Sequence, residues 1–322
     1  MAPRVLVTGS AGQIGAELVP RLRSIYGKDR VVAAIHRSLG GPSLRDGPLI
    51  TLDTGDQAAV SAALKDHRID TVYHLAALLS ATGEKNPQLA WTVNMDGLRS
   101  VLEASRTNGV TRMFWPSSIG AFGPDAPRNN APQNAPMNPT TMYGVTKVAG
   151  ELLCNYYHVK YGLDVRCLRY PGLISNVTPP GGGTTDYAVE IFYEAIRRGS
   201  YTCFLREDTI LPMMYMPDAL KATIQLMEAP ESNVPRHLGY NLAAFSFSAG
   251  ELAAAISKQI RGFRVTYSPD SRQKIADSWP QSIDDTEARR DWGWKPDYDL
   301  QGMVTDMLAN LQSRLRAEGK GV

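Results

Sequence analysis

The sequence predicts an α/β protein with a Rossmann-type, doubly wound parallel sheet and a smaller, interdigitated C-terminal lobe. Short apolar runs alternate with helical patterns through the first half of the chain, as in parallel strands joined by helices. A glycine-rich turn, Gly9-x-x-Gly12-x-x-Gly15, directly follows the first apolar run. After Tyr170 the character of the chain changes, because prolines and glycines interrupt regular structure.

The expected elements follow in order along the chain. Strands are expected at 4–7, 31–35, 49–52, 71–75, 113–116 and 164–169, and helices at 13–26, 57–65, 91–108, 143–161, 187–198, 219–227 and 300–315. There is no internal repeat and no low-complexity linker, so the lobes are expected to interdigitate. We predict a dinucleotide-binding domain over 1–173 and a substrate lobe over 174–322, from which some segments return to the first domain.

Composition excludes several classes of protein. The 322 residues are 43% hydrophobic with a formal net charge of +2, so neither nucleic acid nor an anionic membrane is expected as a partner. A membrane span needs about eighteen consecutive apolar residues, and no apolar run in the sequence approaches that length. The N-terminus lacks the layout of a signal peptide. Cys154, Cys167 and Cys203 show no paired spacing, which indicates reduced thiols in a cytoplasmic protein. No metal site is predicted. A mitochondrial location stays open if the source is eukaryotic.

The glycine turn predicts a dinucleotide site. Gly9 permits the tight turn, Gly12 lets the backbone approach a pyrophosphate, and Gly15 allows close contact between helix and strand. The helix that follows presents free N–H groups to the phosphates. This context, between a strand and a helix, favours a cofactor cradle over an ordinary turn.

The residues around the adenosine end of such a site leave alternatives open. Asp53 could accept a hydrogen bond from adenine, or Asp53 or Asp56 could cap the following helix. The second strand ends in Ile35, His36 and Arg37, with no acid for a ribose 2′-hydroxyl. Arg37 either meets a 2′-phosphate or points to solvent.

A proton-transfer group is predicted from Ser118, Tyr143 and Lys147. Tyr143 and Lys147 are four residues apart on one expected helix and therefore share a face. The lysine charge should lower the pKa of the phenol, so that Tyr143 can take a proton from an alcohol. Ser117 and Ser118 follow a strand, at the sheet edge where ligands bind. Asn94 either caps a helix or orients Lys147 through water.

These motifs together resemble the extended short-chain dehydrogenase/reductase superfamily. More narrowly, the chain is similar to its L-threonine 3-dehydrogenases, which are related to UDP-galactose 4-epimerase. The strings that carry the narrower resemblance span nearly the whole chain: 77–84, 115–123, 169–175, 179–188, 211–216 and 275–280, with Asp284 and Asp285.

The resemblance implies oxidation of L-threonine to 2-amino-3-ketobutyrate with hydride transfer to NAD. It implies Tyr143 as base, Lys147 as its activator and ribose contact, and Ser118 as partner of the reacting oxygen. The implied cofactor contacts are Gly9, Gly12, Gln13, Ile14, Gly15, Arg37, Asp53, Thr54, Leu75, Ala76, Ala77, Asn94, Ser117, Tyr143, Lys147, Pro171, Gly172 and Leu173. The family usually has an aspartate where this chain has Ile35, so NADP stays open beside NAD.

The resemblance also implies a substrate pocket built from Ser118, Tyr143, Ser80, Thr184 and Thr185, with Trp279 closing over the substrate. Hydroxyls of this kind can donate to the threonine carboxylate. For Asp186 we expect a helix cap before Tyr187, the alternative being a contact with the substrate ammonium. Residues 179–186 form the expected lid.

A homodimer is expected from the helices over 91–108 and 143–161. These helices carry apolar residues beyond those that a sheet-facing stripe requires, such as Leu98, Val101, Leu102, Leu152, Leu153 and Tyr157. The resembled superfamily pairs these helices across a two-fold axis. Two other functions compete with the dehydrogenase: a nucleotide-sugar epimerase or dehydratase, and a non-catalytic dinucleotide-sensing protein.

Overall fold

A seven-stranded parallel sheet forms the centre of the computed structural model, which describes residues 2–317. The strand order is β10-β6-β5-β4-β1-β2-β3, and every pairing between neighbours is parallel. The strands are β1 (Val5–Thr8), β2 (Val31–Ile35), β3 (Leu49–Thr51), β4 (Thr71–His74), β5 (Arg112–Ser118), β6 (Asp164–Tyr170) and β10 (Tyr240–Asn241). The predicted Rossmann-type fold is therefore confirmed.

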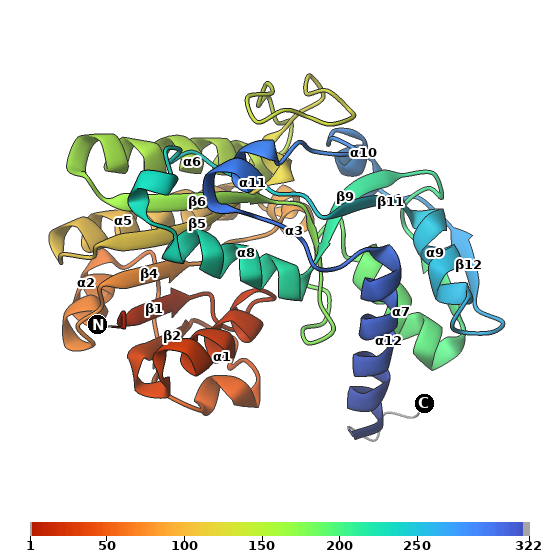
Figure 1. Cartoon of the computed structure of the whole chain (residues 1–322), viewed down its shortest axis with the longest axis horizontal. Coiled ribbons are helices and arrows are strands. Elements are labelled where there is room, and N and C mark those ends of the chain that lie inside the picture. The colour runs from red at the N-terminus through yellow and green to blue at the C-terminus, as the bar shows by residue number, and fades with distance from the viewer. Residues whose placement is uncertain (1, 318–322) are drawn as a thin grey trace.

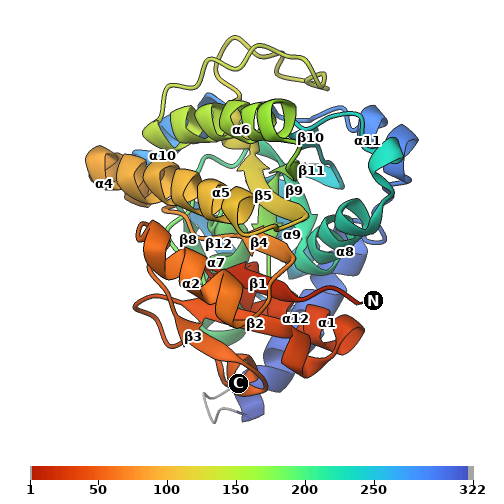
Figure 2. The same ribbon diagram turned by 90° about the vertical axis from the view of Figure 1, so that its left-hand side faces the viewer.

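Helices cover both faces of this sheet (Figures 1 and 2). On one face lie α2 (Gln57–Asp66), α5 (Gly97–Thr107) and α6 (Met142–Tyr161), which share a buried core with β4 and β5. On the other lie α1 (Gly15–Tyr26) and α8 (Met216–Glu228), around a second core. Since both faces are buried, the central strands are almost continuously apolar.

A smaller lobe follows the large sheet in sequence. It contains the sheet β11-β9-β7 and the ribbon β12-β8. Its strands are β7 (Gly172–Ile174), β8 (Ser200–Cys203), β9 (Ile210–Tyr215), β11 (Phe245–Ser248) and β12 (Arg264–Tyr267), and its helices are α7 (Tyr187–Arg198), α9 (Ala249–Ser257), α10 (Arg272–Asp277) and α12 (Leu300–Ala317). They surround a third core.

The two parts of the chain exchange segments. β10 pairs with β6 in the large sheet, and α11 (Thr286–Trp292) contacts β10, although both come from the C-terminal third. β7 begins at Gly172 and already pairs with β9 in the small lobe. The boundary at residue 173 stays a prediction.

The helix expected over 91–108 is built from three pieces. It begins earlier, as α4 (Pro87–Trp91), continues through one π-helical turn (Thr92–Asp96), and ends as α5. Asn86 caps its start by accepting a hydrogen bond from Leu89 N. A second short helix, α3 (Ser80–Lys85), precedes it and was not expected. Asn94 lies within this π-helical turn and is buried.

The choice of dimer residues was partly wrong. Leu98, Val101 and Leu102 are fully buried within the protomer, because they pack against the sheet in the core shared with α2 and α6. Leu152 is 56% exposed, whereas Tyr157 is buried. Further apolar side chains on α4 and α6 are exposed instead: Leu89, Trp91, Tyr156, Val159 and Tyr161. Within residues 2–317, no helix is long and apolar enough to cross a membrane.

Candidate active site

The glycine turn after β1 has a backbone that only glycine can form. Gly9 has a φ of 67°, and a Cβ added there would lie 2.7 Å from Ala76 N. A Cβ at Gly15 would lie 2.5 Å from Gly9 O, so α1 could not pack as closely on the turn. The turn is closed by Gly12 N, which donates to Gly9 O at 3.0 Å. This bare backbone at the start of α1 fits a dinucleotide pyrophosphate.

At the adenosine end, Ile35 packs into the core beside Val7 and is 5% exposed. Asp56, rather than Asp53, caps α2 by accepting from Ala59 N at 3.0 Å. Asp53 instead accepts from Gly55 N at 2.9 Å and lies 3.9 Å from His36 Nε2. The cap is thus assigned to Asp56, and the adenine contact of Asp53 stays a prediction.

Ser118 and Tyr143 are brought together by β5 and α6. Ser118 is the last residue of β5, and its hydroxyl accepts from Gly120 N at 3.1 Å. Thr141 caps α6 by accepting from Gly144 N at 3.1 Å, which places Tyr143 in the first turn. Burial raises the pKa of Tyr143, and a hydrogen bond with Ser118 opposes the rise.

Lys147 lies one turn further along α6 and is buried. Its ammonium donates to Pro116 O at 2.5 Å and lies 4.5 Å from the centre of the Trp115 ring. It is 5.3 Å from the centre of the Tyr143 ring. Burial lowers the pKa of Lys147 to about 8, partly offset by Cys167, Cys154 and Glu151.

The expectation that Lys147 lowers the pKa of Tyr143 is therefore wrong for the site as it stands. Loss of hydration is the largest effect on Tyr143, and it raises the pKa. The ammonium of Lys147 is directed to Pro116 O and to the Trp115 ring.

Asn94 does not cap a helix. Its Oδ1 accepts from Leu78 N at 2.8 Å, and its Nδ2 donates to Leu78 O and to Thr146 Oγ1, both at 3.2 Å. Asn94 therefore links the segment after β4 to α6, on which Thr146 directly precedes Lys147. A water-mediated contact of Asn94 with Lys147 stays a prediction.

At the substrate end, Ser80 and Thr184 lie side by side, with 3.2 Å between their hydroxyl oxygens. The expected cap by Asp186 is wrong, since its side chain makes no cap bond to α7. Its Oδ2 instead accepts from Gly182 N at 2.7 Å and from Gly183 N at 2.8 Å. The glycine loop is held by this carboxylate, whose pKa is raised by burial.

One cavity of about 190 Å³ brings most of the predicted residues together. Its lining includes Gly9, Gly12, Gln13, Ile14, Gly15, Leu75, Ala77, Ser80, Ser117, Ser118, Tyr143, Lys147, Pro171, Gly172, Leu173, Thr184, Thr185, Asp186 and Trp279. Arg37, Asp53, Thr54, Ala76 and Asn94 lie outside that lining. A larger cleft of about 860 Å³ lies between α7 and the β8–β12 ribbon, and its lining includes none of Ser118, Tyr143 and Lys147.

The sequence did not lead us to predict a buried ion pair that begins one helical turn after Lys147. Glu151 and Arg169 are joined by two bonds of 2.8 Å, and both are buried. Ser117 donates to Glu151 at 2.5 Å, and Gly239 N donates to it at 3.1 Å. The signal available in the sequence was the spacing of Glu151, which is four residues after Lys147 on the same helix face. In the described part of the chain, no cluster of His, Cys, Asp or Glu could hold a metal.

Fold and site together define a nicotinamide-dinucleotide-dependent enzyme of the short-chain dehydrogenase/reductase type. The chain belongs to the NAD dependent epimerase/dehydratase family, which it matches over residues 5–243.

Similar proteins support the narrower resemblance. An uncharacterised epimerase/dehydratase of Staphylococcus haemolyticus is 50% identical over 313 residues, covering 97% of this chain and 98% of the relative. A GalE-like L-threonine dehydrogenase from Cupriavidus necator is 52% identical, with a TM-score of 0.94 over 96% of this chain and all of that one. The L-threonine dehydrogenase of Clostridium difficile is 47% identical, with a TM-score of 0.94 over 97% and 98% of the two chains. A UDP-glucose 4-epimerase of Thermotoga maritima, 24% identical, shares the fold alone.

Proposed function

We propose that this enzyme oxidises the 3-hydroxyl of L-threonine to 2-amino-3-ketobutyrate and transfers the hydride to NAD. The observation that carries the proposal is the meeting of Ser118, Tyr143 and Lys147 in one cavity with Ser80 and Thr184. The similar solved structures named L-threonine dehydrogenases support the choice of substrate.

The proton leaves the alcohol through Tyr143. Ser118 donates to the reacting oxygen and holds it beside the phenol oxygen, within the reach that general base catalysis requires. Because burial raises the pKa of Tyr143, its base form depends on the hydrogen bond with Ser118, which opposes that rise. A dinucleotide held at the glycine turn would supply the hydride acceptor for the adjacent carbon, so that threonine would lose one proton and one hydride in a balanced oxidation.

The polar ends of threonine need opposite partners. The hydroxyls of Ser80, Thr184 and Thr185 donate to the carboxylate. Asp186 lies in the same cavity and supplies a negative charge for the ammonium. Trp279 is 4% exposed and supplies an apolar wall that excludes water from the hydride-transfer step.

For the cofactor we propose NAD with weakened discrimination against NADP, because Ile35 replaces the acid that would repel a 2′-phosphate. We also propose a cytoplasmic location, where the three unbridged thiols would stay reduced.

For assembly we propose a homodimer through the exposed apolar face of α4 and α6. One similar structure is named a monomeric L-threonine 3-dehydrogenase, so the state has to be measured. Light scattering at micromolar concentration should give the mass of a dimer. Leu152→Glu, which places a charge on that face, should give a monomer, and a parent protein that is monomeric throughout would contradict the proposal.

The test of the reaction is threonine-dependent formation of NADH, followed by absorbance. The expected result is turnover that requires both threonine and NAD and is lost in Tyr143→Phe. A nucleotide-sugar epimerase is the second candidate, because the curated relatives are named epimerase/dehydratase. Interconversion of UDP-glucose and UDP-galactose without threonine turnover would favour it. Dinucleotide binding without turnover of either substrate would indicate a sensing protein.

A further inference from the structure

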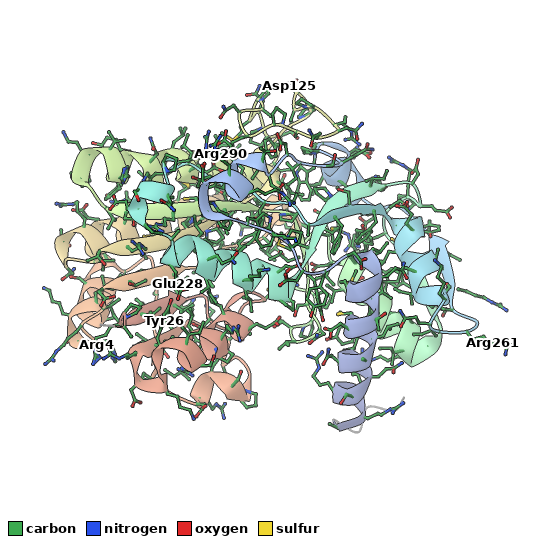
Figure 3. All side chains as sticks on the ribbon, in the orientation of Figure 1. Arg4, Tyr26, Asp125, Glu228, Arg261 and Arg290 are labelled. Atoms are coloured by element: carbon green, nitrogen blue, oxygen red, sulfur yellow. The ribbon has the colours of Figure 1, made fainter. Side chains whose placement is uncertain are left out.

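The chain makes a long excursion between its two reacting residues. Ser118 ends β5 and Tyr143 lies in the first turn of α6, and residues 124–138 between them leave the body of the protein as a loop (Figure 1, top). Asp125 lies at the outer end of this excursion loop (Figure 3). A long ordered loop next to a site is typical of a functional segment.

The outgoing part of the excursion loop binds the chain on both sides of Trp279. Arg128 Nη1 donates to Trp279 O at 3.0 Å and also to Asp277 O. Arg128 O in turn accepts from Gln281 N at 2.6 Å and from Ser282 N at 3.3 Å. Since α10 ends at Asp277, the guanidinium satisfies carbonyl groups that a helix end leaves without partners.

The contact continues as a short parallel pairing. Asn130 has a left-handed backbone, with a φ of 50°, and its N–H donates to Ser282 Oγ at 2.7 Å. Ala131 then forms a β-bridge with Ile283. The side chains of Ala131, Ile283 and Trp279 belong to one buried core. The excursion loop and the Trp279 segment are therefore packed as one unit.

The returning part of the loop is fixed to the catalytic helix. Gln133 is buried and donates to Gly239 O at 2.7 Å, while its own carbonyl accepts from Arg169 at 2.8 Å. Arg169 is paired with Glu151 of α6, one turn after Lys147. The helix of Lys147 is thus hydrogen-bonded through Arg169 to Gln133, and the loop backbone continues from Gln133 to Arg128, which binds the backbone that carries Trp279.

From these contacts we propose that the excursion loop positions Trp279 against the substrate, with Arg128 as the positioning residue. The inference rests on the proposed function, because it assigns Trp279 to the wall of the threonine pocket. Arg128 itself is exposed and lies outside the cavity lining, so it acts only through the tryptophan segment.

The variant that tests this is Arg128→Met, which keeps the aliphatic stem and removes the donors. We expect the KM for threonine to rise about tenfold, the size expected for one or two lost hydrogen bonds. The kcat should change less than about twofold, and the KM for the dinucleotide should not change. Arg128→Lys, which keeps one donor, should recover part of the affinity. The matched control is Arg261→Met, an exposed arginine at the far end of the small lobe (Figure 3).

A double-mutant cycle with Trp279→Ala separates positioning from general stability. If Arg128 acts through Trp279, then Arg128→Met should add nothing to the KM of Trp279→Ala. A full additional tenfold in that background would overturn the proposal, as would an unchanged KM in the single variant. A joint fall in kcat and melting temperature with a rise in both KM values would also overturn the proposal, because it would show that Arg128 acts only on the stability of the fold.

Hydrogen exchange keeps the test independent of the proposed reaction. The amides of Gln281 and Ser282 should exchange faster in Arg128→Met and at the parent rate in Arg261→Met. If the parent protein does not turn over threonine, the proposed function fails. The exchange rates and the effect of Arg128→Met on Trp279 then still decide whether Arg128 holds this segment, and unchanged rates would overturn the proposal.

Discussion

Lys147→Met should separate the stability of this protein from its activity. Lys147 is 3% exposed, and its ammonium has exchanged water for Pro116 O and the Trp115 ring. Methionine retains the length and most of the apolar volume of the side chain but carries no charge. Turnover should fall steeply, since Lys147 is expected to hold the cofactor ribose beside Tyr143.

The size of the stability effect follows from the pKa. The value of Lys147 falls from 10.5 to about 8, chiefly through burial. A difference of about 2.5 units corresponds to about 3 kcal/mol of free energy that opposes folding with a charged lysine. This net difference already includes the favourable contacts of the ammonium with Pro116 O and the Trp115 ring. We therefore expect ligand-free Lys147→Met to be more stable than the parent at pH 7, by up to about 3 kcal/mol.

The pH dependence gives the sharper signature. The folded-state pKa lies below the unfolded one, so the cost of burying the charge is fully present below pH 8. It is relieved as pH rises toward 10.5, because the folded protein then releases a proton that the unfolded chain keeps. The advantage of the variant should fall by about half between pH 8 and about pH 9.5.

The assay is urea unfolding of the cofactor-free protein at several pH values, followed by circular dichroism. Lys258→Met, which changes an exposed lysine directly after α9, is the control and should be near neutral at every pH. If Lys147→Met is clearly less stable than the parent at pH 7 and the difference does not vary with pH, then the buried ammonium stabilises the fold and the reasoning fails.

Three further outcomes are expected. Tyr143→Phe should lower turnover by about 10²–10⁴, the usual contribution of a placed base, while cofactor binding measured by fluorescence titration stays intact. Glu151→Gln should cost about 3–5 kcal/mol in urea unfolding because it leaves the Arg169 charge buried and unpaired, and combining Glu151→Leu with Arg169→Met should recover much of that loss. Ile35→Asp should raise kcat/KM for NAD and depress it for NADP, and Arg37→Ala should affect NADP more than NAD. A parent enzyme that already rejects NADP by about a thousandfold would refute this interpretation of Ile35.

The parts of the site that lie within one element were predictable from the sequence. The glycine turn needed only its spacing and its position between a strand and a helix. The shared face of Tyr143 and Lys147 needed only the helical repeat. The serine at the end of β5 followed from the pattern of an apolar run ending in polar residues. These inferences use distances of a few residues, over which the backbone leaves little choice.

Some of the errors arose where a polar side chain had more than one backbone partner within reach. Asp186 was expected to cap α7, but it binds the N–H groups of Gly182 and Gly183. Asn94 was open to capping until a π-helical turn directed it to Leu78 and Thr146. Local propensity cannot decide such cases, because the competing bonds are similar in energy.

The sequence by itself therefore determined the class of fold, the position of the glycine turn and the candidates for proton transfer. Tertiary structure alone decided the protonation balance of the site, since burial lowers the pKa of Lys147 and raises that of Tyr143. It also decided that Arg128 meets Trp279 across 151 positions of the chain, and that Gln133 joins that contact to the catalytic helix. Hydration is lost only when distant segments pack together. Contacts at such separations form only when burial of the whole core offsets the entropy lost in closing the chain.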